Sequence, residues 1–200
     1  KKALNNFYKS FPKLKKQKFY LFLGRFHEKK GCDVLIKSIK EVEKKVDDIF
    51  LLAGPKTNSN YEKKIQILID KYKLKEKIIF SDMLLDDVKW GAILASKAMV
   101  LSSHGENFGV SLVESMCFGK PVLTTNKVNI SNEILKHKAG LISDDSVDDF
   151  SKIILRFNKY KKKELNIYSK NAYKCFVNQF DLSIEKNSLN ELIKKNINPE

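Results

Sequence analysis

Two glutamates flank a short glycine-containing loop in the middle of the chain. The stretch SHGENFGVSLVE begins at Ser103 and places Glu106 before Gly109 and Glu114 after it. We expect a helix to begin near Gly109, where unpaired backbone N–H groups and the helix dipole favour an anion such as a phosphate. Glycine suits this position because it has no Cβ, so a ligand can approach the backbone closely. The loop is therefore a candidate anion site.

Glu114 falls on the apolar side of this expected helix. At 100° per residue it lies between Val110 and Phe118, away from the polar side marked by Ser111 and Ser115. A carboxylate about 4 Å from a phosphate would be repelled by roughly 4 kcal/mol. We therefore expect Glu114 to contact neutral hydroxyls, such as the diol of a ribose. The alternative is a solvated surface glutamate.

A second candidate loop contains one of the few arginines. The segment LGRFHEKKG places Arg25 and Lys30 between a strand-like run and a helix expected near Gly31, and Arg156 is the only other arginine. An arginine at the end of a strand favours bidentate recognition of a phosphate, although a surface arginine on a turn is the alternative. Lys30 alone is uninformative in a lysine-rich chain. With Glu106 placed to bind a second polyol, the ligand described is a sugar nucleotide.

Alternating strand and helix patterns place these loops at one edge of a sheet. Six short runs rich in β-branched and aromatic residues read as strands, with amphipathic segments between them. We predict an α/β fold, a Rossmann-like parallel sheet of about six strands flanked by helices, with a helical C-terminal segment. Ligands of such sheets bind beyond the carboxyl ends of the strands. The predicted strands end at Gly24, Gly54, Ser81, Ser103, Thr125 and Ile142.

Composition narrows the class of protein further. The 200 residues, 42% hydrophobic and 31% charged, are typical of a folded globular protein. Three separated cysteines without a CxxC pair indicate a reducing cytosol. The formal charge is +14, but the basic residues are spread along the chain and are nearly all lysines. This disfavours nucleic-acid binding and favours weak attraction to acidic lipid headgroups.

Together the motifs resemble the family 4 retaining glycosyltransferases of the GT-B fold. The resemblance lies in Glu106 and Glu114 with Phe108-Gly109 between them, and extends to FLGRFHEKKGCDVLIKSI, ESMCFGKPVLTT and ISNEILKHKAGLI. It covers roughly residues 18–180. It implies that the chain is the C-terminal, nucleotide-sugar-binding half of a two-domain enzyme whose N-terminal acceptor domain is absent. We then expect a linker or loosely attached leader at 1–17, the donor-nucleotide-binding domain at 18–180, and a C-terminal helix and tail at 181–200.

The resemblance also implies roles for individual residues. The diphosphate would contact the cations of the first loop and the first N–H groups of the glycine-capped helix, Glu106 would touch the transferred sugar, and Glu114 the ribose. The base would lie in the loop after the third strand, where Asp82 stands in place of a glycine common in the family. Asn107 replaces another frequent glycine, which narrows the choice of sugar. The implied catalytic residues are Arg25, Lys30 and Glu106. The implied donor-binding residues are Gly24, Met83, Leu84, Asn107, Phe108, Gly109, Val110, Ser111 and Glu114.

The predicted function is that of a glycosyltransferase donor-binding domain. The full enzyme would transfer a hexosyl group from a UDP- or GDP-linked sugar to a glycan or lipid-linked acceptor with retention, in bacterial surface polysaccharide synthesis. We expect this half to be inactive alone, and no metal cofactor, since the sequence contains no Asp-x-Asp.

The alternative is a non-catalytic nucleotide- or polyanion-binding module. A dinucleotide-dependent oxidoreductase is disfavoured because no strand opens onto GxGxxG. The expected partners are the donor and the N-terminal domain, without nucleic acid. The expected location is the cytoplasm, and peripheral contact with the inner face of the membrane is left open.

Overall fold

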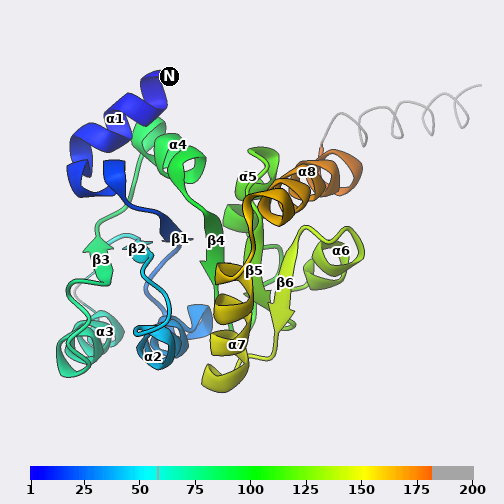
Figure 1. Cartoon of the computed structure of the whole chain (residues 1–200). Coiled ribbons are helices and arrows are strands. Elements are labelled where there is room, and N and C mark those ends of the chain that lie inside the picture. Colours follow the sequence, from blue (N-terminus) through cyan, green and yellow to red (C-terminus); the bar gives the residue numbers. More distant parts are fainter. Residues whose placement is uncertain (58, 182–200) are drawn as a thin grey trace, which may run out of the picture.

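The sheet is parallel and contains six strands. The computed structural model describes residues 1–57 and 59–181, and its strand order is β3-β2-β1-β4-β5-β6 (Figure 1). The α/β fold with a six-stranded parallel sheet is therefore confirmed, and each predicted strand is present. The strands are β1 (Phe19–Leu23), β2 (Ile49–Ala53), β3 (Ile78–Ser81), β4 (Ala98–Leu101), β5 (Val122–Thr125) and β6 (Gly140–Ser143).

Helices cover both faces of the sheet, which explains why the strands are continuous apolar runs. On one face α2 packs against α3 and α7, and on the other face α1 packs against α4 and α8 packs against α5 (Figure 1). The helices after β1 are α2 (Cys32–Val42), α3 (Asn60–Lys71), α4 (Asp86–Ala95), α5 (Val110–Cys117), α6 (Ser131–Lys136), α7 (Val147–Asn158) and α8 (Lys162–Gln179).

The strand order reverses at β1. This strand pairs with β2 on one side and with β4 on the other. The chain leaves β1 toward the face of α2, whereas it leaves β4 toward the face of α5 (Figure 1). Ligand crevices of open α/β sheets lie at such a switch point, beyond the carboxyl ends of the strands. The two candidate loops, which follow β1 and β4, meet there.

The first residues of the chain are folded onto the domain. Helix α1 (Lys2–Ser10) packs along α4, and a 3-10 turn, η1 (Pro12–Lys16), leads into β1. The Phe7 ring is fully buried, and its centroid lies 5.5 Å from that of Phe19 in β1. The expectation of a loosely attached leader is therefore not met. Apolar residues at 4, 7, 8 and 11 have the spacing of one helix face and were the missed signal. The predicted helix and tail fall on residues 182–200, outside the described residues.

Gly91 allows α1 to lie close to α4. A Cβ at this position would come within 2.2 Å of the Ala3 carbonyl oxygen and 2.6 Å of the Phe7 Cβ. We expect Gly91→Ala to lower the free energy of unfolding by about 1–2 kcal/mol, because overpacking costs roughly 1–3 kcal/mol and the better helix propensity of alanine offsets part of it. Urea denaturation measures the change.

Gly105→Ala is the matched control for this prediction. Apart from its two chain neighbours, no atom of residues 1–57 and 59–181 lies within 4 Å of the position its Cβ would take, so its unfolding midpoint should stay close to that of the unmodified protein. Equal midpoints for both variants, with Lys9 in α1 equally protected from trypsin, would show that the α1–α4 contact contributes little to stability.

Candidate functional site

A cavity of about 710 Å³ opens at the carboxyl ends of the strands, at the switch point. It collects residues from the loops after β1, β2, β3 and β4 and from helices α4 and α5. Ten of the twelve residues singled out in the sequence line it. They are Gly24, Arg25, Lys30, Met83, Leu84, Glu106, Gly109, Val110, Ser111 and Glu114.

Hydrogen bonds hold the loops after β1 and β4 together. The Ser102 hydroxyl donates to the Gly31 carbonyl oxygen at 2.7 Å, and the Ser103 hydroxyl donates to the Lys29 carbonyl oxygen at 2.6 Å. Gly31 has a φ of 63°, and a Cβ there would lie 2.0 Å from the Ser102 carbonyl oxygen. Glycine is thus required both by the left-handed backbone and by the close approach of the loops.

Helix α5 begins directly beyond Gly109, as predicted. Gly109 has a φ of 71° and caps the helix, while Val110 and Ser111, its first two residues, line the cavity. The first N–H groups of an α-helix have no acceptor within the helix and carry the positive end of its dipole. The wall formed by the start of α5 therefore favours an anion.

Lys30 and Glu106 form an ion pair across the two loops. The Lys30 Nζ contacts Glu106 Oε2, and the side chains are only 21% and 18% exposed. The Glu106 backbone is fixed by bonds to Lys127 and Asn129. Burial first, and then the positive charge of Arg25, lower the pKa of Lys30. An anion bound beside both cations would favour their charged forms.

Glu114 has a partner that sequence analysis missed. Lys89 Nζ, from α4, lies 2.5 Å from Glu114 Oε1, and the Glu114 side chain is 24% exposed. The same ammonium lies 4.5 Å from the centre of the Trp90 ring. Glu114 is thus a paired carboxylate of the cavity wall and not a solvated surface charge. Lys89 gave no signal of its own because one lysine cannot be told from the others in so lysine-rich a chain.

Arg25 is the cation without a carboxylate partner. It is exposed and lines the cavity, and within the part of the chain that the structure describes no acidic group lies at salt-bridge distance from it. The lysines of the wall, in contrast, are each paired with a glutamate. Arg25 therefore offers a free guanidinium fork to an incoming anion.

The Asp82 side chain occupies backbone N–H groups in and beside the loop after β3. Its Oδ1 accepts hydrogen bonds from the backbone N–H groups of Met83 at 2.7 Å and Lys56 at 3.2 Å. These bonds, with that from Met83 the stronger, hold the pKa of Asp82 below its usual value. The Met83 N–H is thus already used, so a base at this loop would have to meet other backbone groups, such as those of the buried Leu84.

Two predicted residues do not line the cavity. Asn107 is exposed on the loop, and the Phe108 ring packs edge-on against Phe180, with 5.8 Å between the ring centroids. For Phe108 the expected ligand contact was from the backbone, together with that of Gly109, whereas Asn107 was expected to narrow the choice of sugar. The Phe108 side chain therefore contributes to the surface at the end of α8.

Comparison with known proteins identifies the family. The sequence profile of the family described as "Glycosyl transferases group 1" matches residues 5–175. The chain belongs to this family. Among curated relatives, the alpha-1,3/1,6-mannosyltransferase ALG2 of Dictyostelium discoideum is 24% identical over 200 residues, which cover 92% of this chain and 47% of the relative. The chain thus spans about half the length of the curated relatives it matches.

Solved structures of glycosyltransferases share the fold. A glycosyltransferase from Rickettsia africae superposes with a TM-score of 0.86 at 18% identity, covering 98% of this chain and 52% of the other. The Anabaena protein HepE, solved in complex with UDP and glucose, superposes with a TM-score of 0.82 at 18% identity, covering 96% and 52%. The resemblance to GT-B, family 4-like glycosyltransferases is therefore confirmed. No helix within residues 1–57 and 59–181 combines the length and apolar character needed to cross a bilayer.

Proposed function

We propose that this chain is the donor-binding, C-terminal half of a retaining glycosyltransferase. The enzyme would transfer a hexosyl group from a UDP- or GDP-linked sugar to a glycan or lipid-linked acceptor in bacterial surface polysaccharide synthesis. The observation that carries the proposal is the cavity itself, in which the N-terminus of α5 and Arg25, which has no acidic partner among the described residues, lie together with two lysine-paired glutamates. The mannosyltransferase relative, and the neighbour solved with UDP and glucose, support the substrate class.

In this proposal the diphosphate binds between Arg25 and the start of α5. Arg25 supplies a bidentate cation, and the N–H groups of Val110 and Ser111 supply fixed dipoles. Lys30 lies beside Arg25 and is shared between Glu106 and the diphosphate. As the bond to the sugar breaks, negative charge grows on the leaving diphosphate, and groups already in place stabilise it without reorganising. No metal ion is needed in this scheme.

The two glutamates act on the neutral ends of the ligand. Glu106, fixed by the loop at 127–129, would accept hydrogen bonds from hydroxyls of the transferred sugar. Glu114 would accept those of the ribose diol, and Lys89 keeps its charge balanced beside the anionic ligand. The base would lie against the loop that contains Leu84.

Calorimetric titration of the chain with UDP, GDP and ADP tests this proposal. We expect one of the first two to bind best, in the presence of EDTA as well as without it, and the affinity to fall in Glu114→Ala. The chain alone should transfer no sugar, because acceptor contacts are expected from the other half. Binding of none of the nucleotides would contradict the donor site. Sugar transfer by the chain alone would contradict the expectation that the other half supplies the acceptor contacts. Equal binding of inorganic polyphosphate would favour the polyanion-binding module instead.

A further inference from the structure

The start of the chain carries a large excess of positive charge. The first acidic residue is Glu28, and before it stand seven lysines and Arg25. All seven lysines are exposed, and they lie on or beside α1 and η1, whose inner side is anchored by the buried Phe7 and Leu14. We call the exposed side of these two elements, in which Lys2, Lys9 and Lys15 line one cavity, the α1–η1 basic face. Its lysines are Lys1, Lys2, Lys9, Lys13, Lys15, Lys16 and Lys18.

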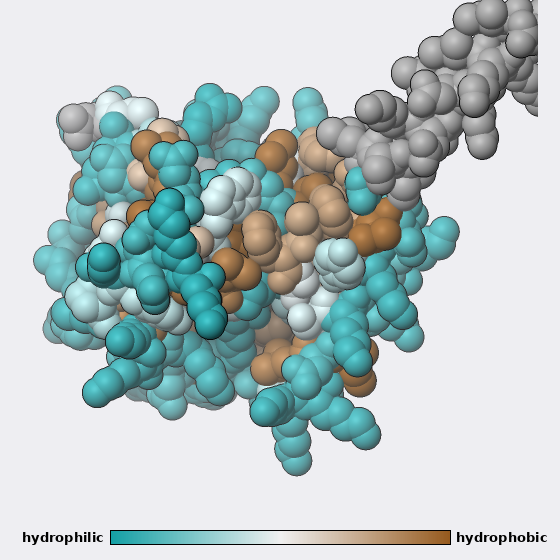
Figure 2. All heavy atoms as spheres, turned by 90° about the horizontal axis from the view of Figure 1, so that it is seen from above, coloured by the Kyte–Doolittle hydropathy of each residue, from teal (hydrophilic) through white to brown (hydrophobic). Residues whose placement is uncertain are grey.

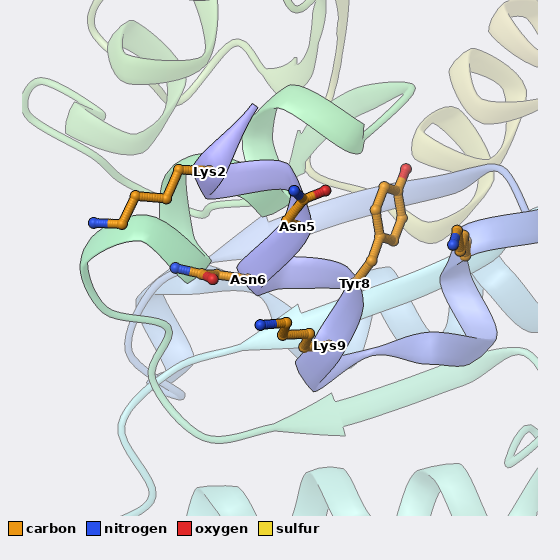
Figure 3. Close-up of a pocket in the computed structure, with 6 residues that line it drawn as sticks. Lys2, Asn5, Asn6, Tyr8 and Lys9 are labelled. Atoms are coloured by element: carbon orange, nitrogen blue, oxygen red, sulfur yellow. The ribbon is translucent and has the colours of Figure 1, made fainter.

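Part of the basic face is concave. An open cavity of about 640 Å³ is lined by Lys2, Lys9 and Lys15 together with Asn5, Asn6 and Tyr8. Figure 3 shows the Lys2, Asn6 and Lys9 side chains extending from the same side of α1.

Most of the positive charge on this face is not neutralised. Lys2 lies 3.0 Å from Asp87 of α4, and within the described residues this is the one salt bridge that a lysine of the face forms. The remaining charges are therefore available to an anionic partner.

We propose that the α1–η1 basic face docks on an anionic lipid surface. Each lysine near an anionic lipid surface raises the partition coefficient of the protein onto that surface about fivefold. This increase requires only that the lysine is charged and exposed. The face contains no arginine, the residue that reads bases and grips phosphates with a planar fork. Exposed lysine ammonium groups on flexible side chains, held on two folded elements of the domain, fit lipid headgroups better than they fit a nucleic-acid groove.

The basic face lies next to the candidate donor cavity. Helix α1 packs on α4, and α4 contributes Lys89 and Trp90 to that cavity. The loop between β3 and α4 borders the donor cavity on one side and a second cavity against α1 on the other, and its Met83 and Leu85 are about half exposed. Figure 2, seen from the side of α1, α4 and α8, shows long hydrophilic side chains toward α1 and an apolar band toward α8.

Docking would therefore hold the donor cavity beside the lipid surface. If the proposed function holds, this placement suits an acceptor carried on a lipid. The docking itself does not depend on glycosyl transfer, because the lysines that carry it lie outside the donor cavity.

Co-sedimentation of the 200-residue chain with vesicles tests the proposal. We expect binding at low ionic strength to vesicles of phosphatidylcholine mixed with phosphatidylglycerol, little binding to phosphatidylcholine alone, and release by added salt. The double variant Lys9→Gln, Lys15→Gln should lower partitioning about 25-fold, at fivefold per lysine. The double variant Lys162→Gln, Lys163→Gln removes the same charge from exposed lysines of α8 and should bind nearly as the unmodified chain does.

The outcomes separate this proposal from its rivals. Equal losses in the two double variants would show that net charge alone drives binding and would overturn a specific face. Unchanged binding in both would overturn it as well. Tighter binding to duplex DNA than to the mixed vesicles, with the same sensitivity at Lys9 and Lys15, would assign the face to nucleic acid. A chain that binds mixed vesicles through these lysines but binds no nucleotide would support docking and contradict the donor site.

Discussion

Arg25→Ala is expected to weaken binding of a nucleoside diphosphate by about 10- to 150-fold and to leave binding of the nucleoside nearly unchanged. A hydrogen bond to a charged group contributes about 1.5–3 kcal/mol, which corresponds to this range. Arg25 lines the cavity without an acidic partner in the described part of the chain, so its guanidinium has no competing contact to lose. Calorimetry with UDP and with uridine, or with the guanine pair if GDP is the ligand, measures the two effects.

Arg156→Ala is the natural control for Arg25→Ala. Arg156 is the only other arginine and lies in α7, whereas the cavity is lined by the loops after β1–β4 and by α4 and α5. Arg156→Ala removes the same charge from the protein and should leave the affinities for the nucleoside diphosphate and for the nucleoside unchanged. Arg25→Lys keeps the charge but loses the fork, so an intermediate affinity is expected. A similar loss for the diphosphate and the nucleoside in Arg25→Ala would show that the arginine does not contact phosphate.

Glu114→Ala is expected to weaken every ligand with an intact ribose by about 100-fold. Two hydroxyls donating to one carboxylate form two charge-assisted hydrogen bonds, and their combined loss is at least of this size. A 2′,3′-dideoxy ligand lacks both donors, so it should bind the unmodified chain poorly and be nearly insensitive to the substitution. Titration of both ligands against both proteins gives the four affinities required.

Lys89 provides the control for Glu114→Ala. Removing Glu114 leaves the ammonium of Lys89 without the carboxylate that lies 2.5 Å from it, and this unpaired charge is a second possible cause of a loss of affinity. The double variant Lys89→Met, Glu114→Ala removes both charges. If the loss of affinity comes from the missing diol contact, the double variant stays weak. Recovery of affinity in the double variant, or tight binding of the dideoxy ligand to the unmodified chain, would refute the diol assignment.

The features of the fold that arise from local pattern were accessible from the sequence. Most strands are short apolar runs that end at a glycine or a polar residue, and a parallel sheet places the ends of such runs at one edge. That rule alone brings Arg25 and Glu106 together, although they are far apart in the chain. The left-handed Gly109 at the start of α5 also follows from local chemistry, since glycine adopts a φ of 71° without strain.

The features that were missed depend on contacts between distant elements. Lys89 matters because α4 packs beside α5, and nothing in its neighbours along the chain marks it. The helical spacing of residues 4–11 was visible, but the burial of Phe7 depends on a glycine of α4 far along the chain. The bond from the Met83 N–H to Asp82 likewise requires the detailed course of one loop.

The hydrogen bonds that the Ser102 and Ser103 hydroxyls donate to backbone carbonyl oxygens join the loop after β4 to the loop after β1. Arg25 and Lys30, which follow β1, and Glu106, which follows β4, are therefore held on loops that these bonds fix to each other. The Met83 side chain, which lines the cavity from the loop after β3 and is about half exposed, takes no part in these two bonds. A substitution at Met83 can therefore change the shape of the cavity while the charged residues of the two joined loops keep their places.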